Sequence, residues 1–365
     1  MDIQSAVAQR AGVGRYTKQL VEHLAPQRQA DELSLFYFDF QRRGEPFPVP
    51  GASLRPVRWL PGRYAQAAWK TIHWPPFDLF SGPADVFHFP NFILPPLSEG
   101  KSVVTIHDLA FLRLPETIEA RNYRYLTSEI QRTVEDADKL IAVSEFTARE
   151  LRDLLGVPAD KVVAIPSGLD PVAAPPDPTE IQAARRMLKL WRPYLLSVGT
   201  LEPRKNYAFL IKLFEALDGY EGDLVIAGMR GWKFEPVMQA IQNSPKAARI
   251  HYLEYVEESL LPGLYAGADL FVFPSLYEGF GFTPLEAMSY GTPVLSSAGG
   301  SLPEVLGRAA AVVPTWEVDA WRAEAQALLA DEGRREALRV AGLVRVKQFR
   351  WEETAARTWD VYRGL

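Results

Sequence analysis

The 365-residue chain contains no cysteine. Disulfide bonds and cysteine-ligated zinc sites are therefore excluded, whereas the cellular compartment is left open by this absence. The sequence also lacks an apolar stretch of about 18 residues that could cross a membrane, and its first residues lack the apolar run of a signal peptide. A cytoplasmic protein is the simplest expectation.

An excess of charge of one sign is lacking as well. Lys and Arg number 40 and Asp and Glu number 45, which gives a formal net charge of −5. A nucleic-acid-binding protein would usually have a strongly basic face, so the composition argues against that class. The hydrophobic fraction of 47% and the charged fraction of 23% are ordinary for a globular protein. The length favours two domains.

Short apolar runs alternate along the chain with longer amphipathic segments. This alternation predicts an α/β protein whose parallel sheets are covered by helices on both faces. The predicted strands are Leu33–Phe40, Asp85–Phe89, Ser102–His107, Lys139–Val143, Tyr194–Val198, Asp223–Ala227, Arg249–Leu253, Asp269–Pro274 and Pro293–Ser296. The predicted helices include Tyr16–Leu24, Ser144–Leu155, Tyr207–Leu217, Leu285–Tyr290 and the amphipathic tail Arg350–Leu365.

The proline-dense segment Leu169–Pro178 can continue neither a helix nor a strand. It predicts an N-terminal domain of residues 1–170 and a C-terminal domain of residues 171–349. Two doubly wound sheets facing a central cleft would bind ligands at the carboxyl ends of their strands. Only Asp2–Gln4 precede the first loop, where a full first strand is expected. Either the start is truncated or this strand is very short.

The most informative segment is Asp269–Ser296, in which a predicted strand runs into a glycine-rich turn and a helix. We expect the helix to open at Thr283 with Pro284 next, so that free backbone N–H groups point at an anion. Thr283 and Glu286 have the spacing of a capping box, which by itself is a sufficient structural explanation for Glu286. Glu278, in the turn, has no evident local structural role, which favours a ligand-binding one.

Arg204 and Lys205 lie between a predicted strand and a predicted helix. An arginine fork and a lysine point charge can together offset the charge of a diphosphate. The alternative is a solvated pair at a loop tip. His107 ends a predicted strand, where a ligand-binding role competes with that of a packed polar residue. Gly12 and Gly14 precede a helix, but Thr17 replaces the third glycine that a nicotinamide-binding loop requires.

Glu278 and Glu286, with seven residues between them, resemble the signature of glycosyltransferase family 4. This is the retaining group with the GT-B architecture of two Rossmann-like domains. Further resemblances follow in the expected order, in Gly12–Thr17, Thr105–Leu109, Val143–Asp170 and Ser197–Asn206. The resemblance covers nearly the whole chain, and its nearest match in appearance is to bacterial O-antigen mannosyltransferases. One departure is Thr200, because many relatives carry an arginine directly after the glycine equivalent to Gly199. Which of Arg204 and Lys205 takes over the charge of that arginine at the diphosphate therefore stays open.

The resemblance implies transfer of a hexose, namely mannose from GDP-mannose, to a hydroxyl of a glycan or lipid-linked acceptor with retention. The catalytic residues that it implies are His107, Glu278, Arg204 and Lys205. The implied donor-binding residues are Gly12, Gly14, Gly199, Arg204, Lys205, Glu278, Gly279, Phe280, Gly281, Phe282, Thr283 and Glu286. Acceptor contacts are expected from Arg15, Tyr16, His88 and Asp108. The last helix, residues 350–365, would cross back onto the N-terminal domain.

No Asp-x-Asp metal motif occurs in a comparable loop, so we expect metal-independent catalysis with no cofactor besides the nucleotide-sugar co-substrate. Arg55–Phe80 mixes aromatic and basic residues, which suits peripheral contact with the inner face of a membrane as well as it suits a core helix with exposed cations. Two rival functions remain. One is another enzyme of the same architecture, such as a nucleotide-sugar epimerase or a phosphorylase. The other is a non-catalytic sugar-nucleotide-binding subunit.

Overall fold

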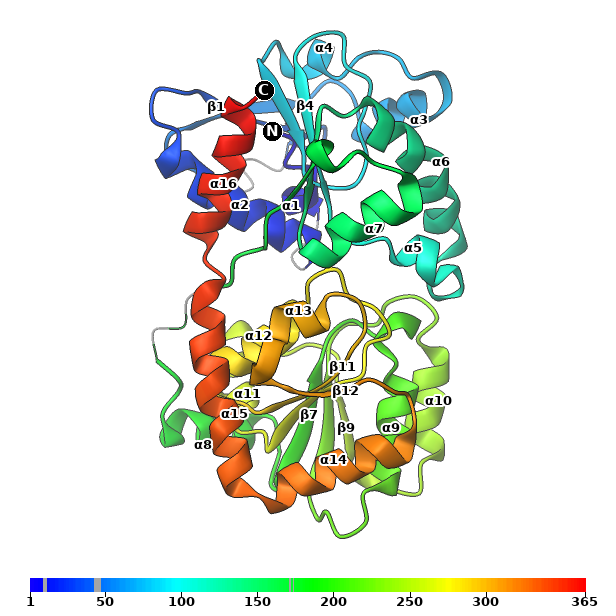
Figure 1. Ribbon diagram of the computed structural model, residues 1–365, viewed down its shortest axis with the longest axis vertical. Coiled ribbons are helices and arrows are strands. Elements are labelled where there is room, and N and C mark those ends of the chain that lie inside the picture. Colours follow the sequence, from blue (N-terminus) through cyan, green and yellow to red (C-terminus); the bar gives the residue numbers. More distant parts are fainter. Residues whose placement is uncertain (9–11, 43–46, 171, 173) are drawn as a thin grey trace. The chain divides into compact units, whose positions relative to one another are not determined.

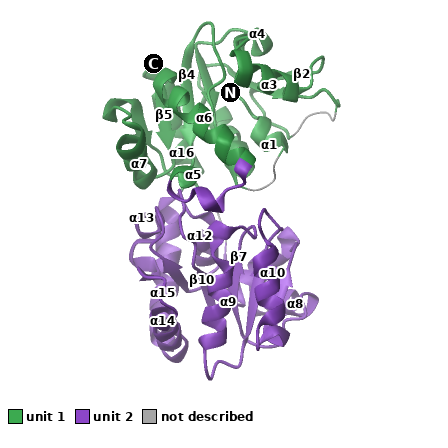
Figure 2. Ribbon diagram, turned by 90° about the vertical axis from the view of Figure 1, so that its right-hand side faces the viewer, with its two compact units in different colours: residues 1–112, 121–168, 350–365 green, residues 113–120, 169–349 purple. Residues whose placement is uncertain are grey.

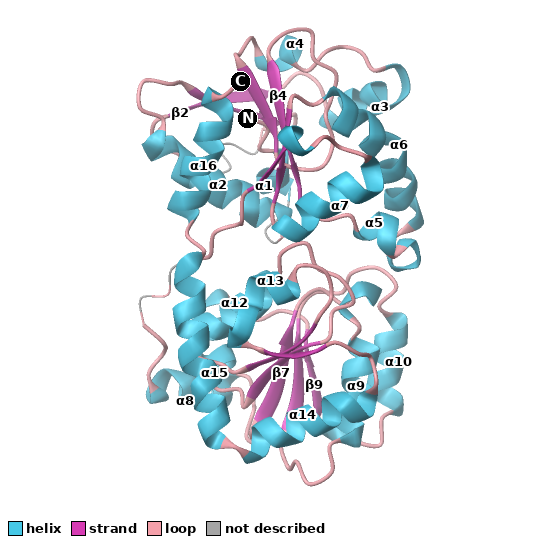
Figure 3. Cartoon of the chain, viewed as in Figure 1, coloured by secondary structure: helices cyan, strands magenta, loops and turns pink. Residues whose placement is uncertain are grey.

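The computed structural model describes residues 1–8, 12–42, 47–170, 172 and 174–365. The chain forms two compact units (Figure 2). Unit 1 comprises Met1–Leu112, Arg121–Gly168 and Arg350–Leu365, and unit 2 comprises Arg113–Ala120 and Leu169–Phe349. The paired strands of the described residues run parallel, and helices flank them in both units (Figure 3). The predicted α/β fold class is thus confirmed.

Unit 1 holds a two-stranded sheet, β1-β2, and a four-stranded sheet in the order β3-β4-β5-β6. Its strands are β1 (Leu33–Phe38), β2 (Ala52–Val57), β3 (Val86–Phe89), β4 (Lys101–Ile106), β5 (Lys139–Ala142) and β6 (Val162–Ala164). Its helices are α1 (Gln4–Ala8), α2 (Val13–Gln27), α3 (Gly62–Ile72), α4 (Asp78–Ser81), α5 (Ala110–Arg113, whose last residue falls in unit 2), α6 (Ala120–Asp136, whose first residue falls in unit 2), α7 (Glu145–Leu155) and α16 (Trp351–Arg363).

Three residues at the start of the chain lie between the two sheets of unit 1. Asp2 forms a parallel bridge with Phe36 of β1, where Ile3 N donates to Phe36 O at 2.8 Å. On the other side, Asp2 N donates to His88 O of β3 at 2.9 Å. Residues 1–3 thus occupy the position of a first strand, although only one residue pairs in the manner of a sheet.

Unit 2 is built on a six-stranded sheet in the order β12-β11-β10-β7-β8-β9. Its strands are β7 (Tyr194–Val198), β8 (Asp223–Ala227), β9 (Ile250–Leu253), β10 (Leu270–Phe273), β11 (Val294–Ser297) and β12 (Ala311–Val313). Its helices are α8 (Pro178–Met187), α9 (Tyr207–Ala216), α10 (Glu235–Asn243), α11 (Leu261–Ala266), α12 (Phe282–Ser289), α13 (Leu302–Leu306), α14 (Val318–Ala330) and α15 (Glu332–Arg345).

The inner strands of unit 2 are buried along all or nearly all of their length, as both faces of the sheet are covered. All residues of β8 and of β10 are buried. One face packs on α9, and Phe214 and Trp321 are fully buried in the cluster that it forms. Such a sheet exposes only its edges and the ends of its strands, so polar side chains that follow a strand gather at those ends.

Helix termini agree with local sequence signals at several places. The Ser144 side chain caps α7 by accepting from Thr147 N at 3.0 Å, and Gly156 ends this helix in a left-handed conformation. Asp177 and Glu180 form a capping box at the start of α8, with Pro178 at its first position. The proline-dense segment therefore ends where α8 begins.

Three strands of the structure were not predicted. Strand β2 carries Arg55 and Pro56 and alternates between half-buried and exposed residues, as suits the edge of a sheet. Strands β6 and β12 have three residues each, which is too short for a recognisable pattern. Sequence periodicity alone therefore recovered the described strands of four or more residues except β2, including the edge strands β3 and β9, and missed the two three-residue strands.

Helix α16 belongs to unit 1, where it lies beside α2 (Figure 1). The Trp359 indole Nε1 donates to Leu24 O at 3.0 Å, and the Thr354 hydroxyl donates to Pro166 O at 2.8 Å. A Cβ atom on Gly168 would lie 2.4 Å from Trp351, so this contact requires glycine. Among the residues that the structure describes, no helix is long and apolar enough to span a membrane.

Candidate active site

The predicted donor-binding residues of unit 2 lie on two loops that follow neighbouring strands and in helix α12, which continues the second loop. Arg204 and Lys205 form a turn of 3₁₀ helix (Pro203–Lys205) after β7, and Glu278 lies between β10 and α12. Strands β7 and β10 pair in parallel, so their carboxyl ends share one edge of the sheet. Leu276 N donates to Arg204 O at 2.8 Å, which ties the two loops together.

Glu278 is the centre of a buried ionic network. Its Oε2 accepts from Arg204 Nη1 at 2.9 Å, and its Oε1 accepts from Lys205 Nζ at 2.6 Å and from the Ser275 hydroxyl. The side chain is only 8% exposed. The sequence-based view that Glu278 has no local structural role is therefore wrong, because this carboxylate balances both neighbouring cations.

Arg204 has further acceptors in the same loops. Its Nη2 donates to Glu202 Oε1 at 2.7 Å, and its Nη1 also donates to Tyr277 O at 2.7 Å. Lys205 Nζ lies 5.1 Å from the centre of the Phe273 ring. The network thus combines two cations with two buried carboxylates, Glu202 and Glu278. Glu202 and Ser275 were missed by sequence reasoning, since only the folded loops bring them to Arg204 and Glu278.

Burial by itself would raise the pKa of Glu278, but the Arg204 and Lys205 charges and the hydrogen bonds from Lys205 and Ser275 outweigh it. They hold this pKa at about 2. The carboxylate is therefore ionised at any physiological pH, and the two cations are compensated without a bound anion.

Glu286 does not form the predicted capping box. Helix α12 starts at Phe282 rather than Thr283, and its N-cap is Gly281 in a left-handed conformation, φ 100°, without a side-chain cap among the described residues. The half-buried Glu286 instead accepts from the Tyr265 hydroxyl at 2.8 Å. Within the described parts of the chain, the N-cap of α12 therefore offers no side-chain acceptor to the backbone N–H groups of the first turn, which suits an anion there.

The turn that carries Gly279, Phe280 and Gly281 is shaped by the loop after β11. Ser301 N donates to Glu278 O at 2.9 Å, and the Ser301 hydroxyl donates to Phe280 O at 3.0 Å. A Cβ atom on Gly300 would lie 2.2 Å from Glu278 O. Gly199, at the end of β7, has φ 155°, and its carbonyl accepts from the Tyr207 hydroxyl at 2.9 Å.

The predicted residues of unit 1 also lie beyond strand ends, but they are packed differently. Half-buried His107 follows β4, and its ring lies 4.8 Å from that of fully buried Tyr16, edge to face. Tyr16 belongs to the first turn of α2, next to Arg15 and after Gly12 and Gly14. The Asp108 carboxylate accepts from the backbone N–H of Ala110, the first residue of the short helix α5, at 3.0 Å.

The tautomer of His107 follows from its hydrogen bond to a carbonyl. Nε2 lies 2.7 Å from Pro90 O, which can only accept, so Nε2 carries the proton. Burial lowers the pKa of His107 below the ordinary value, which favours the neutral ring. Nδ1 therefore presents an acceptor lone pair that a sugar hydroxyl could engage.

His88 lies inside unit 1. Its Nδ1 is 2.5 Å from the Tyr362 hydroxyl of α16, its Nε2 is 2.8 Å from the Thr105 hydroxyl, and the residue is 2% exposed. Burial lowers its pKa to about 3. Both ring nitrogens are engaged within the protein, so in this conformation neither faces an acceptor.

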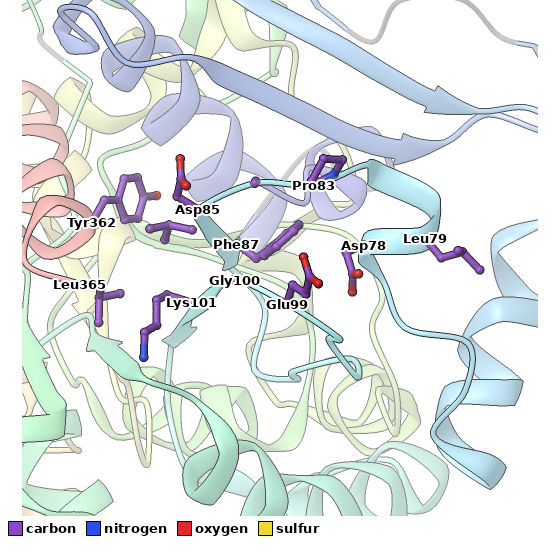
Figure 4. Close-up of a pocket in the computed structure, with 12 residues that line it drawn as sticks. Asp78, Leu79, Pro83, Asp85, Phe87, Glu99, Gly100, Lys101, Tyr362 and Leu365 are labelled. Carbon is purple, nitrogen blue, oxygen red and sulfur yellow. The ribbon is translucent and has the colours of Figure 1, made fainter.

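A cavity of about 760 Å³ occurs at the other edge of the four-stranded sheet, where β3 and β4 begin (Figure 4). Phe87, Glu99, Lys101 and Tyr362 are among the residues that line it. None of the predicted catalytic or donor-binding residues contributes to its wall. Within the described parts of the chain, no group of three His, Asp or Glu side chains is arranged to hold a metal ion.

Comparison with known proteins adds three findings. Residues 10–173 match the model of glycosyltransferase family 4, and residues 180–343 match that of glycosyl transferases group 1. The chain is 33% identical to O-antigen chain mannosyltransferase B of Escherichia coli, over 97% of this chain and 96% of that protein. Among solved structures, it resembles sucrose-phosphate synthase from Thermosynechococcus elongatus, with a TM-score of 0.77, 21% identity and coverage of 100% and 97%.

A second solved structure has a similar fold. It is WaaG, a glycosyltransferase involved in lipopolysaccharide biosynthesis, with a TM-score of 0.75 and 18% identity over 97% of each chain. These structural similarities confirm the predicted GT-B fold, in which each half of the chain is a Rossmann-like domain.

The contact between Gly300 and Glu278 predicts that Gly300→Ala destabilises unit 2. The new Cβ would have to be accommodated at φ +67° and against Glu278 O, at a cost of about 3 kcal/mol. Gly219→Ala is the matched control, because Gly219 also has a positive φ, +77°, but open space around a Cβ atom. Denaturant unfolding measures both. Equal losses of stability would contradict the proposed packing of the Glu278 turn.

The low pKa of Glu278 predicts an acid-dependent contribution to stability. Because the pKa falls from 4.5 to about 2 on folding, the contribution is present above about pH 4.5 and is lost as the pH falls toward 2. Its full size is about 3 kcal/mol. In Glu278→Gln this contribution is absent, so stability should fall less steeply between pH 5 and pH 3 than in the wild type. Parallel pH profiles from urea unfolding would contradict the ion-pair assignment.

Proposed function

The chain belongs to glycosyltransferase family 4, and we propose that it transfers mannose from GDP-mannose to a hydroxyl of a glycan or lipid-linked acceptor, with retention at the anomeric carbon. The observation that carries this proposal is the pairing of Arg204 and Lys205 around Glu278 at the carboxyl edge of the unit 2 sheet. The choice of mannose is supported by the 33% identity to an O-antigen mannosyltransferase over 97% of the chain.

The donor diphosphate would replace Glu278 as the partner of Lys205. Lys205 makes one short ion pair, whereas Arg204 is also fastened by Glu202 and by Tyr277 O. We therefore assign Lys205 to the direct diphosphate contact and Arg204 to a fixed charge behind it. Their positive charges would offset the negative charge that develops on the leaving diphosphate. Glu278, once released, could accept a hydroxyl of the transferred sugar, and Glu286 could accept the ribose hydroxyls.

No metal ion is needed in this scheme, because the two cations take the role that a divalent ion has in other transferases. The backbone N–H groups at Phe282 and Thr283 would add partial positive charge from the start of α12. In unit 1, His107 Nδ1 would accept a sugar hydroxyl, and Arg15 and Asp108 would contact the acceptor. Tyr16 and His88 are buried, so they would act through their neighbours.

The segment Arg55–Phe80 supports a further part of the proposal, peripheral contact with an anionic membrane. Its inner side is packed, since Ala65 is buried and the Trp69 ring contacts Phe38 and Phe80. The same segment exposes five large apolar side chains: Trp59, Tyr64, Ile72, Trp74 and Leu79. Exposed Arg63 and Lys70 lie on the same helix, α3. The packed residues fit a core segment, and the exposed apolar and basic residues support the proposed membrane contact.

Nucleotide binding is the first test. GDP without magnesium should raise the melting temperature more than UDP or ADP do, because the cations replace the metal and the proposed donor carries guanine. Lys205→Ala should abolish most of this shift, whereas Lys212→Ala, an exposed lysine of α9, should keep it. With an acceptor present, Lys205→Ala and Glu286→Ala should lower mannosyl transfer at least about 100-fold.

Several outcomes would contradict this proposal. A shift that requires magnesium would remove metal independence, and a selective shift with UDP would replace the donor. Wild-type turnover in both variants would overturn the site assignment. Donor consumption without an acceptor would favour an epimerase, and use of free phosphate would favour a phosphorylase. Binding without any turnover would favour a non-catalytic subunit.

Sedimentation with liposomes tests membrane contact. At low salt, the wild type should sediment with vesicles of phosphatidylglycerol and phosphatidylcholine and not with phosphatidylcholine alone. The pair Arg63→Glu with Lys70→Glu should lose at least about ten-fold in binding, as each surface cation contributes about 1 kcal/mol. Lys189→Glu with Arg192→Glu makes the same charge change in unit 2 and should bind normally. If both double variants lose liposome binding equally, binding depends on net charge only, which would contradict a specific membrane contact of this segment.

A further inference from the structure

Phe92 has an unusual backbone conformation in the loop after β3. Its φ is +61°, in the left-handed region that bulky side chains rarely occupy. The other described non-glycine residues with positive φ are polar or charged, namely Gln29, Arg42, His73, Lys189, Asn206 and Lys233. Ile93 N donates to Asn91 O at 2.7 Å, so Phe92 is the central residue of a γ-turn. With a positive φ, this turn is of the rare and strained kind.

Two hydrogen bonds fix this turn against the end of β4. Phe92 N donates to Thr105 O at 3.0 Å, and Pro90 O accepts from His107 Nε2 at 2.7 Å. The turn and the His107 ring are therefore coupled, because the carbonyl that sets the His107 tautomer lies two residues before the strained position. A change in the turn would move that carbonyl.

The Phe92 side chain also contacts His107 directly. The two ring centroids are 5.6 Å apart with an angle of 56° between the planes, and Tyr16 contacts the same imidazole at 4.8 Å. Phe92 is half-buried and packs at its other side against fully buried Phe111, at 6.4 Å. An unstrained backbone at position 92 would also allow an apolar side chain to fill this space. It would, however, direct the Phe92 ring away from His107.

We infer that Phe92 is a positioning residue for glycosyl transfer, and that its strained turn holds both its ring and Pro90 O against His107 so that Nδ1 keeps one direction. The inference rests on the proposed function, in which Nδ1 accepts a sugar hydroxyl. Strain retained at a site whose geometry it determines is the pattern expected of functional positions. Catalytic geometry is sensitive to displacements of the order of 1 Å, so loss of this support should lower turnover.

Two variants separate the aromatic ring from apolar bulk. Phe92→Leu keeps an apolar side chain of similar size and loses the ring, and it should lower kcat at least about ten-fold with an unchanged KM for the donor. Phe92→Tyr keeps the ring and should stay within about three-fold of the wild type. Tyr123→Leu, which removes a half-buried ring from α6 of the same unit, should behave as the wild type. A kcat for Phe92→Leu within two-fold of the wild type would overturn the inference.

A second measurement needs no substrate and no turnover. Imidazole ¹⁵N shifts should show His107 as a neutral ring protonated at Nε2 in the wild type and in Phe92→Tyr. In Phe92→Leu the shifts should move toward the average of the two tautomers, and unchanged shifts would overturn the inference. His107→Ala, assayed for transfer, tests the proposed function separately. Full activity in His107→Ala would reject the role of His107, while the ¹⁵N shifts would still decide whether Phe92 positions its ring.

Discussion

A carboxylate buried between two cations organises the candidate donor site. Glu278 joins the loop after β7 to the loop after β10 through Arg204 and Lys205, and one backbone hydrogen bond from Leu276 to Arg204 runs beside it. A buried charge is stable only with nearby partners of opposite sign. Each of these three side chains therefore depends on the others for its position. The backbone around them is correspondingly constrained, as the close approach of Gly300 to Glu278 shows.

The parallel sheet explains why this network can form where it does. Strands β7 and β10 are neighbours in space, although more than seventy residues separate them in the chain. Their covered faces are mostly apolar and carry no charged side chain, so the charges lie beyond the strand ends. The site residues of unit 1 likewise lie beyond strand ends, since His107 follows β4 and the loop of Phe92 follows β3. There the site is built from rings and one carbonyl rather than from ion pairs.

Much of the fold, and the family, could be predicted from the sequence. Long apolar runs revealed the central strands, and the spacing of Glu278 and Glu286 pointed to the family. The partners of these residues could not be predicted, because they depend on contacts between distant segments. Thr283 and Glu286 have a capping spacing, yet the N-cap of α12 is Gly281, two residues before Thr283, and the Tyr265 hydroxyl donates to the Glu286 carboxylate. His88 likewise ends a strand as expected of a ligand-binding residue, but α16 covers it with Tyr362.

The ion pairs of Arg204 and Lys205 with Glu278 would also affect the release of the product nucleotide. If Lys205 holds the diphosphate as proposed, an anion can enter only as Glu278 withdraws, and Glu278 can return as the nucleotide leaves. The carboxylate would then act as a tethered competitor whose effective concentration never falls, however much nucleotide accumulates outside. An intramolecular competitor of this kind lowers the affinity for the product nucleotide more than the affinity for the donor. The donor loses less because its sugar also contacts Glu278. The site would thereby resist inhibition by its own product.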